Sequence, residues 1–178
     1  DLLSQAEHDK MASAVLVCDS MELAKKVSDE IENQIPQLLR KDIARASIDD
    51  NGKIIVADDL VKAIEIANEI APEHLELCLD NPFDYLDSVK NAGSIFMGRY
   101  CPEALGDYFA GPNHTLPTSG TARFSSPLSV DDFVKKIQYT YYTKDALSKV
   151  ANDIAYFAEK EGLSAHARSA TIRFEEEK

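Results

Sequence analysis

Short apolar runs alternate with stretches of helical periodicity over the first hundred residues of the chain. The runs are "AVLVCD" (14–19), "KIIVAD" (53–58), "HLELCL" (74–79) and "AGSIFMG" (92–98). Each is short enough for a buried or half-buried strand, and apolar residues recur at helical intervals between several of them. Strands separated by helices indicate an α/β fold with a parallel or mixed sheet and crossover connections.

Capping residues and prolines set the limits of the predicted helices. Ser20 is a suitable N-cap for the second helix, which Pro36 ends. The stretch "QLLRKDIARA" (37–46) predicts a third helix, and either Asp58 or Asp59 caps a fourth. The apolar residues at helical spacing are Leu2, Leu3 and Ala6 in the first helix (2–10), Leu23, Val27 and Ile31 in the second, and Leu60, Ile64, Ala67 and Ile70 in the fourth.

The stretch 103–129 breaks this pattern, because it is rich in glycine, proline and small polar residues. Such residues disfavour both helix and strand, and a loop longer than about 15 residues is usually either functional or disordered. Large apolar side chains inside the stretch favour an ordered, functional loop over a disordered one. These apolar residues are Tyr108, Phe109, Leu116, Phe124 and Leu128.

The composition changes near Ser129. We expect a helix over about 129–137, a possible Tyr/Thr-rich strand over 137–143, and helical segments near 145–161 and 164–175. The change predicts a domain boundary, with an α/β domain over 1–128 and a small, mainly helical domain over 129–178.

Charge and cysteine content narrow the class of protein. The 178 residues carry a net charge of −12 with no basic cluster, which argues against nucleic acid and anionic membrane surfaces as partners. No apolar run approaches the length of about 18 residues that a membrane span needs. Three cysteines without a CxxC spacing indicate reduced thiols in a cytoplasmic protein. The chain opens inside a helical pattern without Met, so we expect a piece of a longer protein.

Two of the four histidines stand beside residues with which they could act. Gln5 and His8 are three positions apart, so on a helix they share one face; this pattern fits either half of a metal site or a solvated polar face. His74 follows Glu73 at a predicted helix-to-strand junction, where active sites of α/β proteins collect. The pair could supply a general base and a carboxylate that orients water, or it could be a surface pair at a sheet edge.

The other two histidines lie in the long loop and near the C-terminus. Asp107 could ligate a cation, and His114 could hydrogen-bond a polar substrate. His166, with Glu161 a short distance before it, lies on a predicted C-terminal helix and by itself is typical of a surface histidine. The sequence contains no GxGxxG or GxxxxGK[ST] loop, no GxSxG elbow and no HExxH motif, so no nucleotide site is apparent.

Four stretches of the chain together resemble one family, histidinol dehydrogenase, in the family's order and spacing. They are "DLLSQAEHD" (1–9), "NEIAPEHLEL" (68–77), "NAGSIFMGRYCPEALGDYFAGPNHTLPTSGTARFSSPLSVDDF" (91–133) and "EGLSAHARSATIR" (161–173). The third stretch is very specific to that family. The resemblance covers essentially the whole chain, with small departures at Lys10 and Pro127, neither of which matches a ligand position.

The resemblance implies a homodimer with a zinc ion in each active site. The zinc ligands carry over to Gln5, His8 and Asp107 of one subunit and to His166 of the partner subunit. The same residues, with Glu73, would contact the substrate. An N/O site of this kind could also hold manganese or cobalt.

The resemblance also implies the chemistry: L-histidinol is oxidised through the aldehyde to L-histidine by two NAD⁺, in the last steps of histidine biosynthesis. His74 matches the general base that removes protons from the alcohol and then from the aldehyde hydrate, and Glu73 matches the residue that activates water. His114 and, across the dimer, Glu161 match substrate-binding positions.

Length is the main departure from the family. The missing part is the N-terminal half, which supplies much of the nicotinamide-binding region and the first half of a pseudo-duplicated α/β domain. The resemblance therefore implies a three-layer sheet with helices on both faces over 1–128 and a small C-terminal dimerisation domain over 129–178. We expect this polypeptide alone to have little or no dehydrogenase activity.

Two rival interpretations use the same residues. One is a non-catalytic fragment that dimerises and holds zinc. The other is a zinc hydrolase built from the four metal ligands, with Glu73 activating water; metal-dependent ester or amide cleavage without NAD would be its sign.

Overall fold

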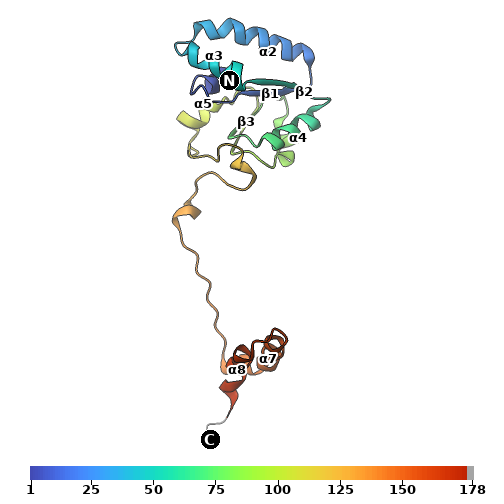
Figure 1. Cartoon of the computed structure of the whole chain (residues 1–178), viewed down its shortest axis with the longest axis vertical. Coiled ribbons are helices and arrows are strands. Elements are labelled where there is room, and N and C mark those ends of the chain that lie inside the picture. Colours follow the sequence, from blue (N-terminus) through green and yellow to red (C-terminus); the bar gives the residue numbers. More distant parts are fainter. Residues whose placement is uncertain (176–178) are drawn as a thin grey trace. The chain divides into compact units, whose positions relative to one another are not determined.

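The computed structural model describes residues 1–175, which form two compact units divided between Phe133 and Val134 (Figure 1). The division lies four residues beyond Ser129, where the composition changes. Each unit is described by itself below.

The first strand pair of the larger unit joins β1 (Val15–Cys18) to β2 (Lys53–Val56) in parallel, with Val15 opposite Lys53. The crossover between them contains α2 (Met21–Gln34), the 3₁₀ turn η1 (Ile35–Gln37) and α3 (Lys41–Asn51). Both α2 and α4 (Leu60–Ile70) pack on this pair, which lies between them in Figure 1. The second and fourth helices and both strands predicted here are confirmed, whereas the third helix forms over Lys41–Asn51 rather than over 37–46.

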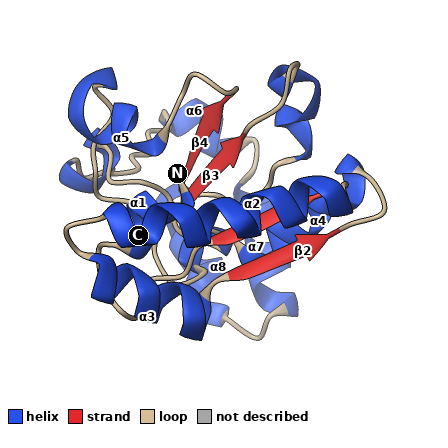
Figure 2. Cartoon of the chain, turned by 90° about the horizontal axis from the view of Figure 1, so that it is seen from above, coloured by secondary structure: helices blue, strands red, loops and turns tan. Residues whose placement is uncertain are grey.

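The second strand pair joins β3 (His74–Leu77) to β4 (Ser94–Met97), again in parallel (Figure 2). Their connection is short and contains only the 3₁₀ segment η2 (Pro82–Ser88). Among residues 1–175 no ladder of hydrogen bonds joins this pair to β1–β2, so the structure has two small parallel sheets where the strand pattern predicts one.

Side-chain caps begin two of the helices as expected. The Ser20 hydroxyl accepts a hydrogen bond from the Leu23 amide (3.2 Å), and Asp59, rather than Asp58, accepts one from the Lys62 amide (2.7 Å). The caps satisfy N–H groups that have no partner inside the helix.

The end of α4 aims the chain into β3. Ala71 is buried and adopts a left-handed conformation (φ 52°) directly before Pro72. A proline disfavours the right-handed helical conformation in the residue before it, so α4 cannot continue. The helix-to-strand junction predicted before His74 is confirmed.

A cluster of small and branched apolar residues holds α1 (Leu2–Ala6) on α3 and η1. Leu3, Ala6, Ile35 and Ala44 are its buried members. The helix ends at Ala6, earlier than the predicted range 2–10, and a turn follows in which the Met11 amide donates to the Asp9 carboxylate (2.8 Å). That side-chain bond competes with continuation of the helix.

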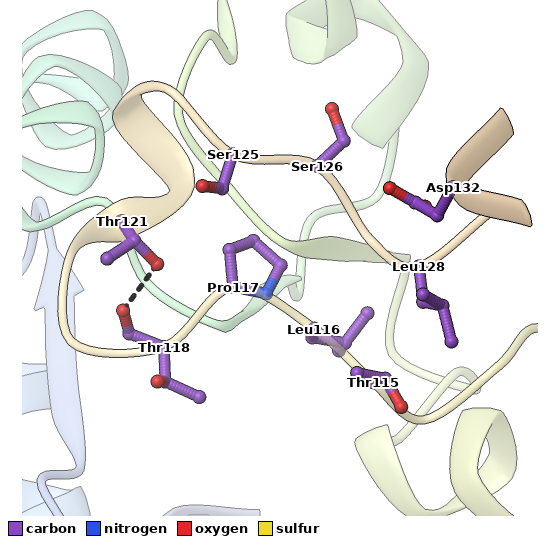
Figure 3. Close-up of a pocket in the computed structure, with 9 residues that line it drawn as sticks. All are labelled: Thr115, Leu116, Pro117, Thr118, Thr121, Ser125, Ser126, Leu128 and Asp132. Carbon is purple, nitrogen blue, oxygen red and sulfur yellow. Dashed lines mark hydrogen bonds between the residues drawn. The ribbon is translucent and has the colours of Figure 1, made fainter. Parts of the chain in front are cut away.

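The long loop is tied together by its own hydrogen bonds, so the prediction of an ordered loop is confirmed. The Leu128 amide donates to the Thr115 carbonyl (3.0 Å), and the Thr121 hydroxyl donates to the Thr118 carbonyl (2.6 Å) (Figure 3). Arg123 donates to the carbonyl of Glu69 at the end of α4, which fixes the loop to the residues before Glu73. A hollow is lined by Thr115, Leu116, Pro117, Thr118, Thr121, Ser125, Ser126, Leu128 and Asp132.

Two predictions after the loop are wrong. The helix expected over 129–137 is one 3₁₀ turn, η5 (Val130–Phe133), and the strand expected over 137–143 does not form. Residues 134–143 have no helix or strand and are exposed. A strand requires a partner for its backbone groups, and an isolated short helix is marginal in water, so periodicity alone does not fix either element.

The smaller unit is helical, with α6 (Lys144–Ser148), α7 (Ala151–Lys160), α8 (Ser164–Thr171) and the 3₁₀ turn η6 (Ile172–Phe174). Helices α7 and α8 pack on each other, and the buried residues are small: Ala151, Ala158, Ala167 and Ala170. None of the helices among the described residues is long and apolar enough to cross a membrane.

Candidate active site

One face of the β3–β4 pair carries polar chemistry. Side chains alternate between the two faces of a strand, so His74 and Glu76 share a face while Leu77 is buried on the other. Phe96 lies opposite Glu76 in the parallel register and is 5% exposed. Its ring meets the His74 ring edge-on, with the centroids 5.9 Å apart. The buried ring of Phe96 therefore lies beside the polar side chains of His74 and Glu76.

A short helical segment covers this face. It begins as α5 (Glu103–Leu105) and continues as a π-helical turn, η3 (Gly106–Ala110). The Glu103 amide donates to the Glu76 carboxylate (2.9 Å), which anchors the segment to β3. A Cβ at position 106 would lie 2.6 Å from Phe96 Cε1, so only glycine lets the turn approach the ring this closely.

Glu103, the first residue of this segment, faces His74 on β3. The distance from His74 Nε2 to Glu103 Oε1 is 3.8 Å, and the two side chains are 15% and 14% exposed. Nε2 is buried and has no hydrogen-bond partner among the described residues. A buried polar nitrogen without a hydrogen-bond partner is costly. The unpartnered Nε2 of His74, with a carboxylate 3.8 Å away, is therefore the most unusual polar feature of the site.

Asp107 connects the covering turn to the long loop. Its carboxylate lies 2.8 Å from Nδ1 of His114, and its side chain is 14% exposed, whereas that of His114 is 69% exposed. The π-helical turn places Asp107 four residues after Glu103, on the same side of the segment. The site therefore contains three carboxylates (Glu76, Glu103 and Asp107) and two imidazoles, drawn from three segments.

Burial and the contacts among Glu103, Asp107 and His114 shift the pKa of each group. Burial and a hydrogen bond to Asp107 raise the pKa of Glu103 to about 7. Burial acts to raise the pKa of Asp107 as well, but hydrogen bonds from His114 and Glu103 outweigh it and hold that pKa below its ordinary value. The hydrogen bond to Asp107 raises the pKa of His114. Near pH 7 Asp107 is therefore ionised, whereas Glu103, whose pKa is about 7, is divided between its protonated and ionised forms.

The same residues offer donors suited to a metal ion. One ligand atom each of His74, Glu103 and Asp107 lies within 4.8 Å of the other two. Imidazole nitrogen and carboxylate oxygen are both zinc ligands in proteins. The donor types near Asp107 thus fit a zinc ion, and of these three residues only Asp107 is among the four predicted ligands.

Four of the predicted site residues come together in this region. Glu73, His74, Asp107 and His114 interact directly or through their charges: Glu73 contributes to the raised pKa of His114, and His74 to the lowered pKa of Asp107. The Glu73 carbonyl also accepts from the Ser94 amide (2.8 Å), which fixes it at the start of the β3–β4 ladder.

The reason given for expecting a site beside His74 needs correction. Active sites of parallel sheets collect at the carboxyl ends of strands. His74 is the first residue of β3. Its side chain belongs to the covered face of the β3–β4 pair, so the covering α5–η3 segment, rather than the strand end, creates the site.

Gln5 and His8 lie on α1 and in the turn after it. The His8 amide donates to the Gln5 carbonyl (3.3 Å), and Arg40 donates to the His8 carbonyl (3.1 Å). Within residues 1–175 no hydrogen bond or ion pair joins either side chain to Asp107. The start of α1 is nevertheless beside β3, since ligand atoms of Asp1, Glu76 and Cys78 lie within 4.8 Å of one another.

Glu161 and His166 belong to the smaller unit and are exposed there. Glu161 caps the C-terminal end of α7, and the His166 carbonyl on α8 accepts from the Ser169 hydroxyl (2.7 Å). The side chains of both residues are therefore accessible at the surface of the smaller unit.

Sequence reasoning missed Glu103. The available signal was its spacing from Asp107: two carboxylates four positions apart after a helix-starting proline, Pro102, indicate a shared helical face. The interruption of the pattern by Gly106 hid this signal.

Comparison with known proteins agrees with the resemblance seen in the sequence. The profile of the family described as histidinol dehydrogenase matches residues 1–174. Histidinol dehydrogenase of Caldanaerobacter subterraneus subsp. tengcongensis is 62% identical over 174 residues, 98% of this chain and 40% of that protein. The Bacillus cereus (strain ATCC 14579) protein of the same name is 60% identical over 178 residues, 100% of this chain and 42% of that protein.

A solved structure shows the same similarity. The crystal structure of histidinol dehydrogenase from Elizabethkingia anophelis matches 97% of this chain and 40% of its own chain, with a TM-score of 0.91 and 40% identity. This chain spans about two fifths of the length of these relatives. A family profile that covers nearly every residue, and relatives this similar, leave one assignment: the chain belongs to the histidinol dehydrogenase family.

Proposed function

We propose that this chain is the part of a zinc- and NAD-dependent histidinol dehydrogenase that carries its acid–base and metal-binding residues. The complete enzyme would oxidise L-histidinol through the aldehyde to L-histidine, consuming two NAD⁺ and one water and releasing two NADH and three protons. The observation that carries the proposal is the gathering of Glu73, His74, Asp107 and His114 around one covered sheet face.

His74 is proposed as the general base. Its imidazole is half-buried at the start of β3, and it rests against Phe96. A base of this kind would take a proton first from the substrate hydroxyl and then from the aldehyde hydrate, and it works best when its pKa lies near the working pH. Glu73, the preceding residue, is proposed to activate the water that adds to the aldehyde.

Zinc would be held by Gln5, His8 and Asp107 of one subunit and by His166 of the partner subunit. When bound, zinc supplies an electrophilic centre that binds and orients polar groups of the substrate. Asp107 suits this role because its carboxylate is ionised and held by His114. Exposure of His166 in its own unit is consistent with a ligand that acts on another chain.

Substrate contacts are proposed for the metal ligands and Glu73, for His114, and for Glu161 of the partner subunit. The smaller unit would serve as the dimerisation domain of a cytoplasmic homodimer. In the complete protein the two strand pairs would belong to a three-layer sheet with helices on both faces.

A second candidate is a zinc-binding fragment that dimerises without catalysis. The length of the chain favours it for the isolated polypeptide, because about three fifths of each relative has no counterpart here. In this proposal the fragment holds metal and the remaining sequence supplies the nicotinamide site.

The first test measures NADH formation, bound zinc and solution mass for the purified chain. We expect no histidinol-dependent NADH formation. We also expect the mass of a dimer, with about one zinc ion bound per chain. His166→Ala should abolish zinc binding, while Arg168→Ala, a neighbouring exposed residue of α8, should retain it. NADH formation by the chain alone would contradict the inactive-fragment proposal, and NAD-independent ester or amide cleavage would favour a hydrolase.

The catalytic assignment needs the complete dehydrogenase. There His74→Asn should lower kcat by about 10²–10⁴-fold, the usual range for loss of a general base. An activity within a few-fold of wild type would remove His74 from the proposed mechanism.

A further inference from the structure

Glu103 matches none of the roles proposed above, yet its carboxylate faces the ring of the proposed base. Its Oε1 lies 3.8 Å from His74 Nε2, and both side chains are largely buried. Nε2 has no other partner among the described residues. Contacts of catalytic groups are often long before substrate binds and then shorten, so a separation slightly beyond hydrogen-bond distance is consistent with a functional pair.

The position of Glu103 is fixed relative to the same strand that carries His74. Its amide donates to the carboxylate of Glu76 (2.9 Å), two residues after His74 on the same face of β3. One strand therefore holds both the imidazole and the anchor of the carboxylate that faces it. Motion of the covering segment relative to the ring is limited by this bond.

The ring itself has restricted freedom. Phe96 meets it edge-on, and Gly106 allows the covering turn to lie directly against Phe96. Packing of this kind fixes where the ring lies, but it does not decide which of the two ring nitrogens carries the proton in the neutral form. That choice depends on a hydrogen-bonding partner.

We propose that Glu103 is a positioning residue that accepts a hydrogen bond from Nε2 of His74 and thereby keeps Nδ1 unprotonated. The inference rests on the proposed role of His74 as base. Nδ1 would take the proton from the substrate hydroxyl, and both ring nitrogens would then be protonated. The proton on Nε2 stays on the ring, and the carboxylate of Glu103 stabilises the imidazolium without accepting a proton.

The first test reads the tautomer directly. In the purified, metal-free chain labelled with ¹⁵N-histidine, ring-nitrogen shifts are measured about two pH units above the ordinary histidine pKa of about 6.5, where neutral tautomers are compared. Only four histidines contribute, so His74 can be assigned with one His74→Gln spectrum. We expect Nε2 of His74 to be the protonated nitrogen.

Three variants give this measurement its controls. Glu103→Met keeps the length of the side chain but removes the acceptor, so His74 should shift to a mixture of tautomers. Glu103→Gln keeps an acceptor oxygen and should restore the Nε2-protonated form. Glu22→Met, on the exposed surface of α2, should leave the spectrum unchanged. A folded Glu103→Met chain with the wild-type tautomer of His74 would overturn the proposal, as would an Nδ1-protonated ring in the wild type.

The second test uses the complete dehydrogenase. Glu103→Met should lower kcat by about 10–100-fold, the usual loss when a group that orients a functional histidine is removed, with KM changed by less than about threefold. Glu103→Gln should recover part of that loss. A fall in bound zinc that accounts for the lost activity would make Glu103 a metal ligand and overturn the positioning role.

The two tests separate this inference from the proposed function. The tautomer measurement requires no catalysis, so it can support the Glu103–His74 contact even if His74 proves not to be the base. If the wild-type chain shows the expected tautomer but His74→Asn keeps full activity, the role of His74 as general base is contradicted, while the Glu103–His74 contact is still supported.

Discussion

The two compact units both carry proposed site residues, but they hold them differently. In the larger unit Glu103, Asp107, His74 and His114 are brought together by a strand pair, a covering turn and a loop. In the smaller unit Glu161 and His166 are exposed at helix surfaces. The larger unit thus organises its site residues by packing within the chain, whereas the smaller unit presents its two residues at its own surface.

Their aromatic residues show the same contrast. Phe96 is 5% exposed beneath the candidate site, while Phe157 on α7 is 66% exposed. The buried contact of α7 and α8 is made by alanines, which contribute little apolar area each. We expect the larger unit to be the more stable of the two, and the following variants test this difference from the largest expected effect to the smallest.

Paired truncation of the two phenylalanines should separate the units most clearly. Phe96→Ala opens a cavity under His74 and should lower the free energy of unfolding of the larger unit by about 3–5 kcal/mol. Phe157→Ala removes an exposed ring and should change stability by less than about 0.5 kcal/mol. Urea unfolding of the chain at low concentration measures both. Equal effects would show that α7 buries its outer face in the isolated chain.

Glu103→Gln should alter how stability depends on pH. The pKa of Glu103 is about 7 in the folded protein and near 4.5 when unfolded. Between these values the folded state binds more protons than the unfolded state, so stability falls as pH rises from about 4.5 to 7. At about 1.4 kcal/mol per pKa unit the fall attributable to Glu103 is at most about 3.5 kcal/mol, and coupling to Asp107 reduces it.

Urea unfolding of the metal-free chain at several pH values between 5 and 8 measures this fall. The variant should show a flatter profile between pH 5 and 7 than wild type. His114→Asn is the matched control. The raised pKa of His114 contributes stability below about 6.5 that is lost as pH rises through its folded pKa, so the control alters the upper part of the profile. An unchanged slope in Glu103→Gln would show that Glu103 ionises normally.

Alanine substitution at two glycines compares the cost of steric crowding, at Gly93, with the cost of backbone strain, at Gly162. A Cβ at Gly93 would lie 2.6 Å from the Glu73 carbonyl oxygen and 3.0 Å from Pro117, so Gly93→Ala should cost about 1–3 kcal/mol and disturb the start of the β3–β4 ladder. Gly162 has open space but a φ of +76°, so Gly162→Ala should cost only about 1–2 kcal/mol from strain. Thermal unfolding gives the order. A larger loss at Gly162 would mean that the smaller unit is the more sensitive.

Helix caps provide the mildest comparison. Ser20 caps a helix of 14 residues in the larger unit, and Thr143 caps a helix of 5 residues in the smaller one. Each cap should contribute about 1 kcal/mol to its helix. Ser20→Ala should lower the unfolding midpoint of the larger unit, while Thr143→Ala should only fray α6, seen as faster amide exchange there. A global shift from Thr143→Ala would show that α6 is integral to its unit.

Sequence was most informative where structure is local. Ser20 and Asp59 cap helices through side-chain bonds that any short window of sequence contains, and the period-two alternation of "HLELCL" separates His74 and Glu76 from Leu77. Elements that need a distant partner were predicted poorly. The Tyr/Thr-rich residues 137–143 have strand propensity but no neighbouring strand, so they stay irregular.

The candidate site divides in the same way. Glu73, His74, Asp107 and His114 could be named from motifs, and the structure brings them together. Glu103 was missed, because its spacing from Asp107 was the only sequence signal, while its importance comes from the bond of its amide to Glu76 and from its position opposite a buried nitrogen. Both are products of tertiary packing, across 27 residues of sequence for the bond to Glu76 and 29 (103 − 74) for the contact with His74.

Residues 134–143 have a practical consequence for studying this protein. Proteases and peptide ligases need an extended, accessible stretch of backbone, and this segment is exposed throughout with no helix or strand to unfold. A cut here followed by enzymatic religation would yield a chain with isotope labels on one side of the junction only. His8, His74 and His114 would then be observed without the signal of His166, or His166 alone, in an otherwise native polypeptide.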